Sequence, residues 1–200
     1  MPLQKLLIAS NNAHKVTEFR RLFEHLPIEL VTPNDIELAL DVEETGETFE
    51  ANARLKAHAF AKASSLPALA DDSGIEVDAL DGRPGVRSAR YGGDGLDDEG
   101  RVQLLLQEMA SVPDGQRACR YRVVLVLVDQ SGAEETTEGR CEGSVAWSTS
   151  GANGFGYDPV FYVPAFGKTI ADIDPDQKDG ISHRGIAARA MAEVLASRTV

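Results

Sequence analysis

The stretch "ALADDSGIEVDAL" (Ala68–Leu80) runs from an apolar segment into two adjacent carboxylates and then into an alternation of apolar and acidic residues. Two neighbouring anions at the edge of a core repel each other and resist desolvation, so we expect a positive partner nearby. Because side chains alternate faces along a strand, we expect only one of Asp71 and Asp72 to point into a site. The alternative is an Asp-Ser-Gly turn in which a carboxylate makes local backbone bonds.

The composition is that of an ordinary globular protein. The chain has 200 residues, 42% of them hydrophobic, a net charge of −12 and two cysteines, Cys119 and Cys141. We expect one domain over residues 1–200 and a reducing compartment. The acidic balance argues against nucleic-acid partners. No apolar run approaches the ~20 residues of a membrane span, and the start "MPLQKLLIASNN" does not resemble a signal peptide. The sequence therefore predicts no membrane partner and a cytoplasmic location.

Strand-like and helix-like segments alternate in the first half of the chain, and a hairpin follows. The apolar spacing predicts strands at 5–10 and 28–31, helices beginning near Asn12, Thr48 and Asp97 or Asp98, a hairpin over 121–147 and a last helix after Ser182. This order predicts the α/β class with a mixed β-sheet.

Two segments carry cationic groups near predicted helix starts. "SNNAHK" (residues 10–15) lies where a strand meets a helix N-terminus, which favours anions, and Lys15 adds a positive charge. The alternative is an exposed helix start with a solvated lysine. In "DVEETGETFEANARLKA" (residues 41–57), Asn52 and Lys56 are one helical turn apart, after a loop with Glu43 and Glu44. The alternative is that this loop is a solvated acidic segment with no functional role.

The remaining segments offer oxygen ligands, flat rings and cationic donors. The carboxylates of "DDSG" suit Mg²⁺, which takes one or two carboxylates plus waters and phosphates. "GANGFGYDP" (residues 151–159) pairs flexible glycines with aromatic rings on which a nucleobase can stack, or it is a buried aromatic hairpin. "KDGISHRG" (residues 178–185) places Lys178, His183 and Arg184 around a helix start. A bound anionic or carbonyl-bearing ligand, or the protein's own acids, would explain these donors.

Taken in order, six segments closely resemble the inosine/xanthosine triphosphate pyrophosphatase family, which cleaves deaminated purine nucleoside triphosphates. They are "SNNAHK", "EETGETFEANARLKA", "ADDSGIEVDAL", "GRPGVRSARY", "GFGYDPVF" and "KDGISHRG". The resemblance covers nearly the whole chain. It implies an elongated mixed sheet with flanking helices that form two lobes around a nucleotide-binding cleft. It also implies a Mg²⁺-dependent homodimer, with one or more ions per subunit, that hydrolyses ITP, dITP and XTP to NMP and pyrophosphate and keeps these nucleotides out of DNA and RNA.

The same resemblance implies roles for individual residues. Asp72 would be the general base and, with Glu43, a metal ligand, while Asp71 supports them; Lys15 and Lys56 would be catalytic cations. The implied substrate-binding residues are Ser10, Asn11, Asn12, Ala13, His14, Lys15, Ser73, Phe155, Gly156, Tyr157, Asp158, Lys178, His183 and Arg184. Among them, Ser10, Asn12 and Lys15 would hold the triphosphate, residues 155–158 would frame the base, and Lys178, His183 and Arg184 would read its keto edge.

The chemistry of the base explains why donors are expected there. Hypoxanthine and xanthine present an O6 acceptor where adenine presents an N6 donor, and a site built on hydrogen bonds can reject the wrong base by ~10⁴-fold. Asn11, Ala152 and Asn153 depart from the glycine-rich pattern usual in the family, so we expect altered kinetics. The alternatives are a pyrophosphatase for modified pyrimidine nucleotides, against which "SHRG" argues, and a nucleotide sensor, against which Glu43, Asp72 and Lys15 argue. The order among ITP, dITP and XTP, the rejection of GTP and the replacement of Mg²⁺ by Mn²⁺ stay open.

Overall fold

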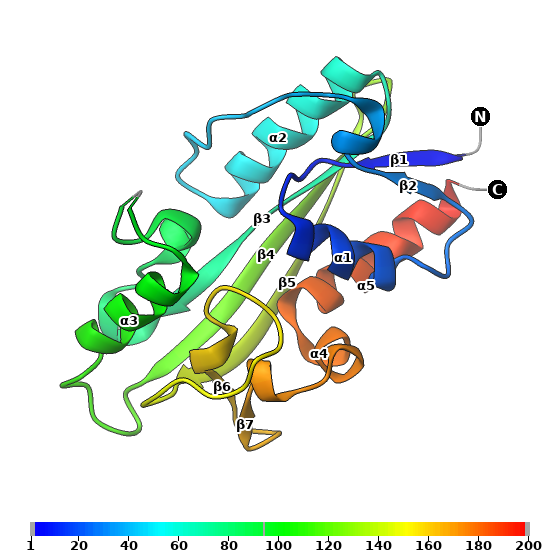
Figure 1. Cartoon of the computed structure of the whole chain (residues 1–200). Helices are drawn as coiled ribbons and strands as arrows, with labels where there is room; N and C mark the ends of the chain where they lie inside the picture. Colours follow the sequence, from blue (N-terminus) through cyan, green and yellow to red (C-terminus); the bar gives the residue numbers. More distant parts are fainter. Residues whose placement is uncertain (1–2, 94, 199–200) are drawn as a thin grey trace. The chain divides into compact units, whose positions relative to one another are not determined.

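The computed structural model describes residues 3–93 and 95–198 and contains a seven-stranded sheet with flanking helices (Figure 1). The strand order is β2-β1-β3-β4-β5-β6-β7. β1 pairs in parallel with β2 and β3, whereas β6 pairs antiparallel with β5 and β7. The predicted α/β class with a mixed sheet is therefore confirmed. The strands are β1 Lys5–Ile8, β2 Glu29–Val31, β3 Ala68–Val77, β4 Ala118–Val128, β5 Glu134–Val145, β6 Phe161–Val163 and β7 Lys168–Thr169.

Most helices begin at the capping residues that the sequence predicts. The Thr48 hydroxyl accepts from Ala51 N, and the Asp97 carboxylate accepts from Gly100 N. The short helix before Ser182 was not predicted; it begins after Asp174, whose carboxylate accepts from Gln177 N. The helices are α1 Ala13–Leu22, α2 Phe49–Ser64, α3 Asp98–Glu108, α4 Pro175–Ile181 and α5 His183–Ser197, with 3₁₀ turns at Asn34–Ile36, Asp78–Leu80, Gly85–Arg90, Asp158–Val160 and Ile170–Asp172.

The register of β1 on β3 positions the loop after β1 close to the acidic pair. Leu7 lies opposite Ala68 and Ile8 opposite Leu69, and Ala9 N donates to Leu69 O at 2.8 Å. β1 ends there, while β3 continues through Asp71 and Asp72 to Val77. The alternative of an Asp-Ser-Gly turn is therefore wrong, because both carboxylates belong to an uninterrupted strand.

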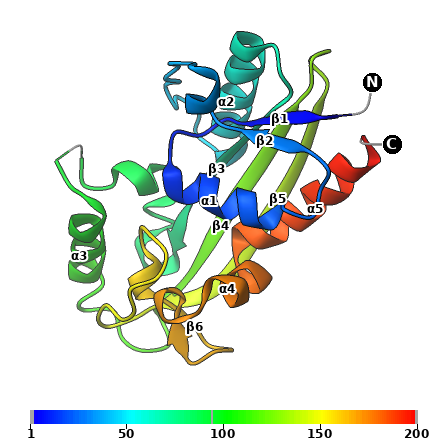
Figure 2. The same ribbon diagram turned by 45° about the vertical axis from the view of Figure 1, so that its right-hand side comes forward.

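The described chain divides into two compact units. Unit 1 comprises the segments up to Asp72, Val123–Gly139 and from Arg184 onward; unit 2 comprises Ser73–Arg122 and Arg140–His183. In unit 1, α1 and α5 lie side by side (Figures 1 and 2). The core of unit 1 consists of Leu6, Ile8, Phe19, Phe23, Leu69, Val123, Leu125, Leu127, Ala187, Ala188, Met191, Ala192 and Leu195.

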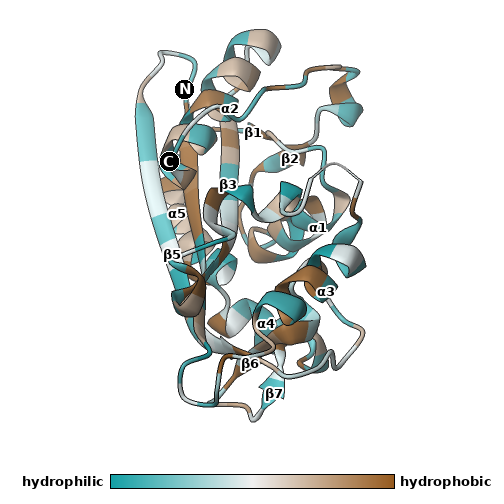
Figure 3. Ribbon diagram, turned by 90° about the vertical axis from the view of Figure 1, so that its left-hand side faces the viewer, coloured by the Kyte–Doolittle hydropathy of each residue, from teal (hydrophilic) through white to brown (hydrophobic). Residues whose placement is uncertain are grey.

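Unit 2 has a core of its own, richer in aromatic rings. It consists of Ile75, Val77, Leu80, Val102, Leu105, Met109, Cys119, Tyr121, Cys141, Val145, Tyr157, Val160, Phe161, Val163, Ile170 and Ile173. Both cysteines are buried free thiols, and burial raises the pKa of Cys141 to about 11. β5 alternates exposed and buried positions over residues 138–142, and much of it is coloured as hydrophilic in Figure 3. Among the described residues, no helix is long and apolar enough to cross a membrane.

Candidate active site

Asp71 is the centre of a buried ionic network in unit 1. Its Oδ2 atom lies 2.9 Å from Lys15 Nζ on α1 and 3.1 Å from Arg184 Nη2 on α5. The other end of the Arg184 guanidinium lies 2.5 Å from the carboxylate of Glu18, also on α1. Lys15 and Glu18 are three residues apart and so share one face of α1. Arg184 therefore forms ion pairs with both Asp71 and Glu18. Asp71 forms a second ion pair, with Lys15.

The Asp72 side chain contacts residues of a different helix, α2. Its Oδ2 atom accepts a hydrogen bond from Asn52 Nδ2 at 3.1 Å, and its Oδ1 atom lies 3.4 Å from Lys56 Nζ. Asn52 and Lys56 are one turn apart on α2, so the helical spacing seen in the sequence brings both to one carboxylate. The alternation expected along β3 is thus observed: the Asp71 contacts come from α1 and α5, and the Asp72 contacts come from α2.

The two neighbouring carboxylates have pKa values shifted in opposite directions. Burial opposes the ionisation of Asp71, but Lys15, Arg184 and Lys56 outweigh it and hold the Asp71 pKa well below its usual value. For Asp72 burial dominates, the nearby Glu44 acts in the same direction, and the pKa is raised despite Lys56 and Lys15. Asp71 is therefore the member of the pair that stays charged at neutral and mildly acidic pH, and Asp72 is the better proton acceptor.

The two lysines also differ. Burial, together with repulsion from Lys56 and Arg184, lowers the pKa of Lys15 even though Asp71 favours its charge. The pKa of Lys56 is raised, because Asp72, Asp71 and Glu44 outweigh its burial. Their side chains are 17% and 13% exposed, so each ammonium is largely enclosed without being sealed from solvent.

Glu44, and not Glu43, approaches the Asp72 cluster. The Glu44 carboxylate lies 2.6 Å from Lys56 Nζ, whereas Glu43 is exposed to solvent. Glu44 and Asp72 thus converge on one ammonium, which places hard oxygen donors where they can share a cation. Within the described ranges, no three His, Cys, Asp or Glu side chains are grouped as a metal cage. Two carboxylates suit Mg²⁺, which completes its shell with water and phosphate oxygens.

The segment after β1 forms the N-terminus of α1. Ser10 Oγ accepts from Asn12 N, and Asn12 Oδ1 accepts from His14 N at 2.9 Å and Lys15 N at 3.2 Å. Asn12 is therefore the N-cap of α1. Residues 11–14 are exposed. An accessible helix N-terminus with an adjacent lysine is a favourable environment for an anion.

In unit 2, Asp158 is the buried hub of the "GFGYDP" segment. Its Oδ2 atom accepts from Phe155 N at 3.0 Å and from Lys178 Nζ at 2.8 Å, and its Oδ1 atom accepts from the Tyr121 hydroxyl at 3.1 Å. A Cβ atom at Gly154, where φ is +77°, would lie 2.0 Å from Asp158 Oδ2, so the close approach of this loop requires glycine. Asp158 therefore holds the loop together from within.

The aromatic and cationic residues predicted to meet the base lie around this hub. Lys178 Nζ is 5.2 Å from the centroid of the half-buried Phe155 ring. His183, which is 5% exposed, stacks on Tyr121 at 4.6 Å between ring centroids. Tyr157 is buried and donates from its hydroxyl to Ser88 O at 3.0 Å.

The predicted site residues thus fall into two groups, one in each unit. Unit 1 brings together Asp71, Asp72, Lys15, Lys56 and Arg184; it also contains Ser10, Asn11, Asn12 and Glu43 in loops and Ala13 and His14 in the first turn of α1. Unit 2 brings together Phe155, Gly156, Tyr157, Asp158, Lys178 and His183, and also contains Ser73. Arg184, predicted to read the base, is buried against Glu18 and Asp71 in unit 1.

Sequence reasoning missed Glu18, Tyr121 and the position of Glu44. Glu18 follows Lys15 by one helical turn, and this spacing could have predicted that both side chains lie on the same face of α1. Tyr121 belongs to an apolar strand and looks like an ordinary core residue, so no local pattern marks it. Glu43 and Glu44 are neighbours in a loop, and only tertiary contacts distinguish them.

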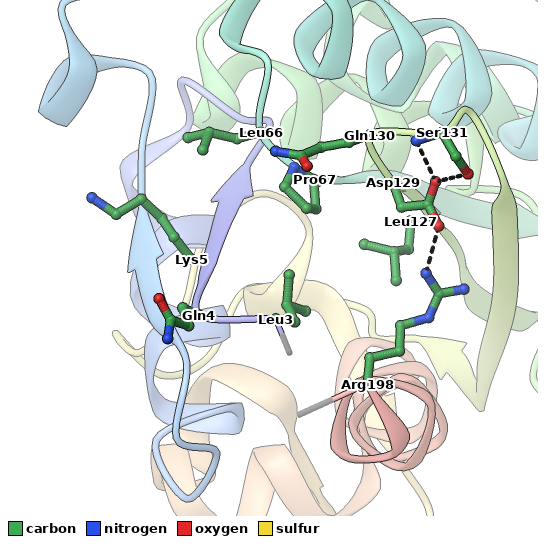
Figure 4. Close-up of a pocket in the computed structure, with 10 residues that line it drawn as sticks. All are labelled: Leu3, Gln4, Lys5, Leu66, Pro67, Leu127, Asp129, Gln130, Ser131 and Arg198. Carbon is green, nitrogen blue, oxygen red and sulfur yellow. Dashed lines mark hydrogen bonds and ion pairs between the residues drawn. The ribbon is translucent and has the colours of Figure 1, made fainter. Parts of the chain in front are cut away.

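A separate pocket of about 550 Å³ lies in unit 1 at the amino-terminal ends of β1 and β3 (Figure 4). Its one arginine, Arg198, points to Asp129 at 3.0 Å and also reaches Glu135 at 3.1 Å. The acidic pair lies several residues further along β3, so this pocket does not include the Asp71–Asp72 cluster.

Comparison with known proteins places the chain in a family. Residues 6–194 match the sequence model of the Ham1 family. The chain is 41% identical to the dITP/XTP pyrophosphatase of Bacillus cereus over 195 residues (96% of this chain, 95% of the relative). It is 44% identical to that of Shigella flexneri (96% and 98%). The solved structure of a HAM1 protein from Coxiella burnetii superposes with a TM-score of 0.88 at 39% identity, covering 98% of this chain and all of that one. The chain therefore belongs to the Ham1 family.

Proposed function

We propose that this protein is a nucleoside-triphosphate pyrophosphatase that converts dITP, ITP and XTP to the nucleoside monophosphate and pyrophosphate. The similar proteins from Bacillus cereus and Shigella flexneri are named dITP/XTP pyrophosphatases, which supports this substrate class. The observation that carries the proposal is that the adjacent carboxylates of Asp71 and Asp72 differ in their ion pairs and in their pKa. One carboxylate is neutralised by Lys15 and Arg184, and its neighbour keeps a raised pKa beside Lys56.

Asp72 is the general base in this mechanism. A water molecule attacks the α-phosphorus, its proton passes to the Asp72 carboxylate, and a new P–O bond forms. The bond from the α-phosphorus to the oxygen that bridges to the β-phosphate breaks, and pyrophosphate leaves with that oxygen. Asn52 and Lys56 hold the Asp72 side chain in place, while its raised pKa favours acceptance of the proton.

Lys15 and Lys56 bind the phosphates by charge. Asp71 orients Lys15 from one side, and the exposed N-terminus of α1 adds the positive end of the helix dipole. In phosphoryl transfer most of the rate comes from such positioning and electrostatic stabilisation.

The charge balance supports a divalent cation. The unit 1 cluster has four carboxylates, Glu18, Glu44, Asp71 and Asp72, and three cations, Lys15, Lys56 and Arg184. This excess of negative charge repels a triphosphate unless another cation accompanies it. We propose Glu44 and Asp72 as the residues that hold Mg²⁺, in place of the predicted Glu43 and Asp72. When bound, the ion polarises phosphate oxygens and lowers the pKa of its water.

The unit 2 cluster recognises the base in this proposal. Lys178 and His183 are donors for the O6 acceptor that hypoxanthine and xanthine share, and the Phe155 ring offers a face for stacking. The base-reading role of Arg184 stays a prediction. Its contacts with Glu18 and Asp71 give it an additional proposed role, that of positioning Asp71.

Product analysis tests the proposal most directly. Purified protein with Mg²⁺ is incubated with ITP, dITP, XTP, GTP, ATP and dTTP, and pyrophosphate is measured separately from orthophosphate. We expect pyrophosphate and monophosphate from ITP, dITP and XTP, and little from GTP and ATP. Release of orthophosphate would exclude attack at the α-phosphorus. Preferential cleavage of pyrimidine nucleotides would support the alternative pyrophosphatase class, and binding without turnover would support a sensor.

We further propose a homodimer and a cytoplasmic location, on the resemblance to the family and the acidic composition. Light scattering coupled to size-exclusion chromatography gives the mass in solution directly, to be compared with the 21.5 kDa of one chain. A monomer over the concentration range of the activity assay would exclude the dimer as the active species.

A further inference from the structure

Tyr121 occupies the centre of a three-ring stack in unit 2. It lies on β4, with the Phe161 ring on one side at 4.5 Å between centroids and the His183 ring at 4.6 Å. The interplanar angles are 15° and 17°, so the three rings are nearly parallel. All three side chains are buried. Stacking on the face of the Tyr121 ring therefore restrains the orientation of the His183 imidazole.

The hydroxyl of the same ring reaches the hub of the "GFGYDP" segment. It donates to Asp158 Oδ1 at 3.1 Å, while Asp158 Oδ2 accepts from Lys178 and from Phe155 N. Burial and the Asp158 carboxylate raise the pKa of Tyr121 well above 10, so the hydroxyl keeps its proton and stays a donor. One side chain thus contacts His183 through its ring face and Asp158 through its hydroxyl.

We propose that Tyr121 is a positioning residue for nucleobase recognition, which fixes His183 by stacking and the Phe155–Asp158–Lys178 arrangement by its hydrogen bond. The inference rests on the proposed function, in which these residues face the base. Tyr121 itself does not touch the substrate. Because its two contacts are made by different parts of the side chain, the hydrogen bond can be removed while the stack is kept.

Two substitutions separate the contacts. Tyr121→Phe keeps the ring stack and removes the hydrogen bond to Asp158, and Tyr121→Leu removes the stack as well. Tyr162→Phe is the matched control, since Tyr162 lies in the same unit on β6 and belongs to neither contact. Steady-state kcat and KM are measured for ITP and GTP at a temperature where all variants are folded, together with the thermal midpoint.

For Tyr121→Phe we expect the KM for ITP to rise about tenfold, the factor that one lost hydrogen bond of ordinary strength accounts for, with kcat within about twofold of wild type. For Tyr121→Leu we expect a larger rise in KM and a smaller preference for ITP over GTP, because His183 loses its support. Tyr162→Phe should match wild type. A purely structural role would lower the thermal midpoint of the Tyr121 variants and leave KM and base preference unchanged, and that result would overturn the proposal.

The outcomes also separate this proposal from the proposed function. If wild-type protein releases no pyrophosphate from ITP, the function is wrong and the positioning role falls with it. If wild type is active and selective while Tyr121→Phe keeps its KM, only the positioning role is wrong. If Tyr121→Leu fails to fold, the comparison of Tyr121→Phe with Tyr162→Phe still decides the question.

Discussion

The two clusters of candidate site residues satisfy a buried carboxylate in different ways. In unit 1, Asp71 faces two cations, Lys15 and Arg184, within a network of alternating charges. In unit 2, Asp158 accepts from one cation, one hydroxyl and one backbone amide, and the hydroxyl belongs to a stacked ring. Charged partners produce a strong field suited to phosphates, whereas mixed donors and rings define direction and shape, which suits recognition of a base.

The difference also affects how much stability each cluster loses when one partner of its buried carboxylate is substituted. Removing Arg184 takes away a cation that two buried carboxylates, Asp71 and Glu18, share. A carboxylate with three kinds of donor keeps the other two.

Asp72→Asn should lower kcat by about 10²- to 10⁴-fold, the range for loss of a general base, because the amide cannot take the proton of the attacking water. The protein should stay folded and still bind ITP, since Asn52 and Lys56 pack against a side chain of the same shape. Pyrophosphate release and isothermal calorimetry measure the two properties. Asp81→Asn, at an exposed position whose φ of 54° suits asparagine, is the control. Near-normal turnover of Asp72→Asn would remove Asp72 from the role of base.

Arg184→Met should destabilise the protein by about 3–5 kcal/mol, the usual cost of removing one partner of a buried ion pair. It leaves both Glu18 and Asp71 without their shared cation. Lys178→Met should cost less, because Asp158 retains Tyr121 and Phe155 N as donors. Urea denaturation of both variants gives the free energies of unfolding. An equal or larger loss for Lys178→Met would contradict the contrast between the two clusters.

The pH dependence of stability should differ in sign for the two adjacent carboxylates. The folded-state pKa of Asp71 is lowered, so its contribution to stability is present above the unfolded value of about 3.9 and is lost as the pH falls through the folded value. The folded-state pKa of Asp72 is raised, so its contribution is present at low pH and is lost as the pH rises through the folded value.

The free energies of unfolding of Asp71→Asn and Asp72→Asn, measured by urea denaturation between pH 3 and pH 7, test this difference in sign. The deficit of Asp71→Asn relative to wild type should shrink as the solution is acidified. Asp72→Asn should instead gain stability relative to wild type as the pH rises from 4 to 7. Parallel curves for the two variants would show that the carboxylates share one electrostatic environment.

Loss of a helix cap should have the smallest effect, and a similar one in each unit. Thr48→Ala at α2 and Asp97→Ala at α3 each remove one acceptor from a helix N-terminus, which costs about 1 kcal/mol. Thr48→Ser and Asp97→Asn keep an acceptor and serve as controls. The thermal midpoint of each pair measures the difference. A loss several times larger at one cap would show that its side chain supports more than the helix end.

Much of the fold could be predicted because the signals are local. The apolar spacing of residues 16–23 marks α1, and Thr48 and Asp97 mark the starts of α2 and α3. The short helix α4 escaped detection because seven residues carry too little periodicity. The residues of the candidate site could be predicted mainly because the sequence resembles a known family. Helical spacing alone predicted that Asn52 and Lys56 lie on one face of a helix.

The sequence by itself determined the order of the longer strands and helices, the caps at Asn12, Thr48 and Asp97, and the family, because these depend on residues within a few positions of one another or on motifs in a fixed order. Only the tertiary structure decided which partners each buried carboxylate has. Arg184 and Asp71 are 113 positions apart, and Tyr121 and Asp158 are 37 positions apart. The physical reason is that burial makes an unpaired charge costly, so its partner is whichever donor packing brings within reach, at any distance along the chain.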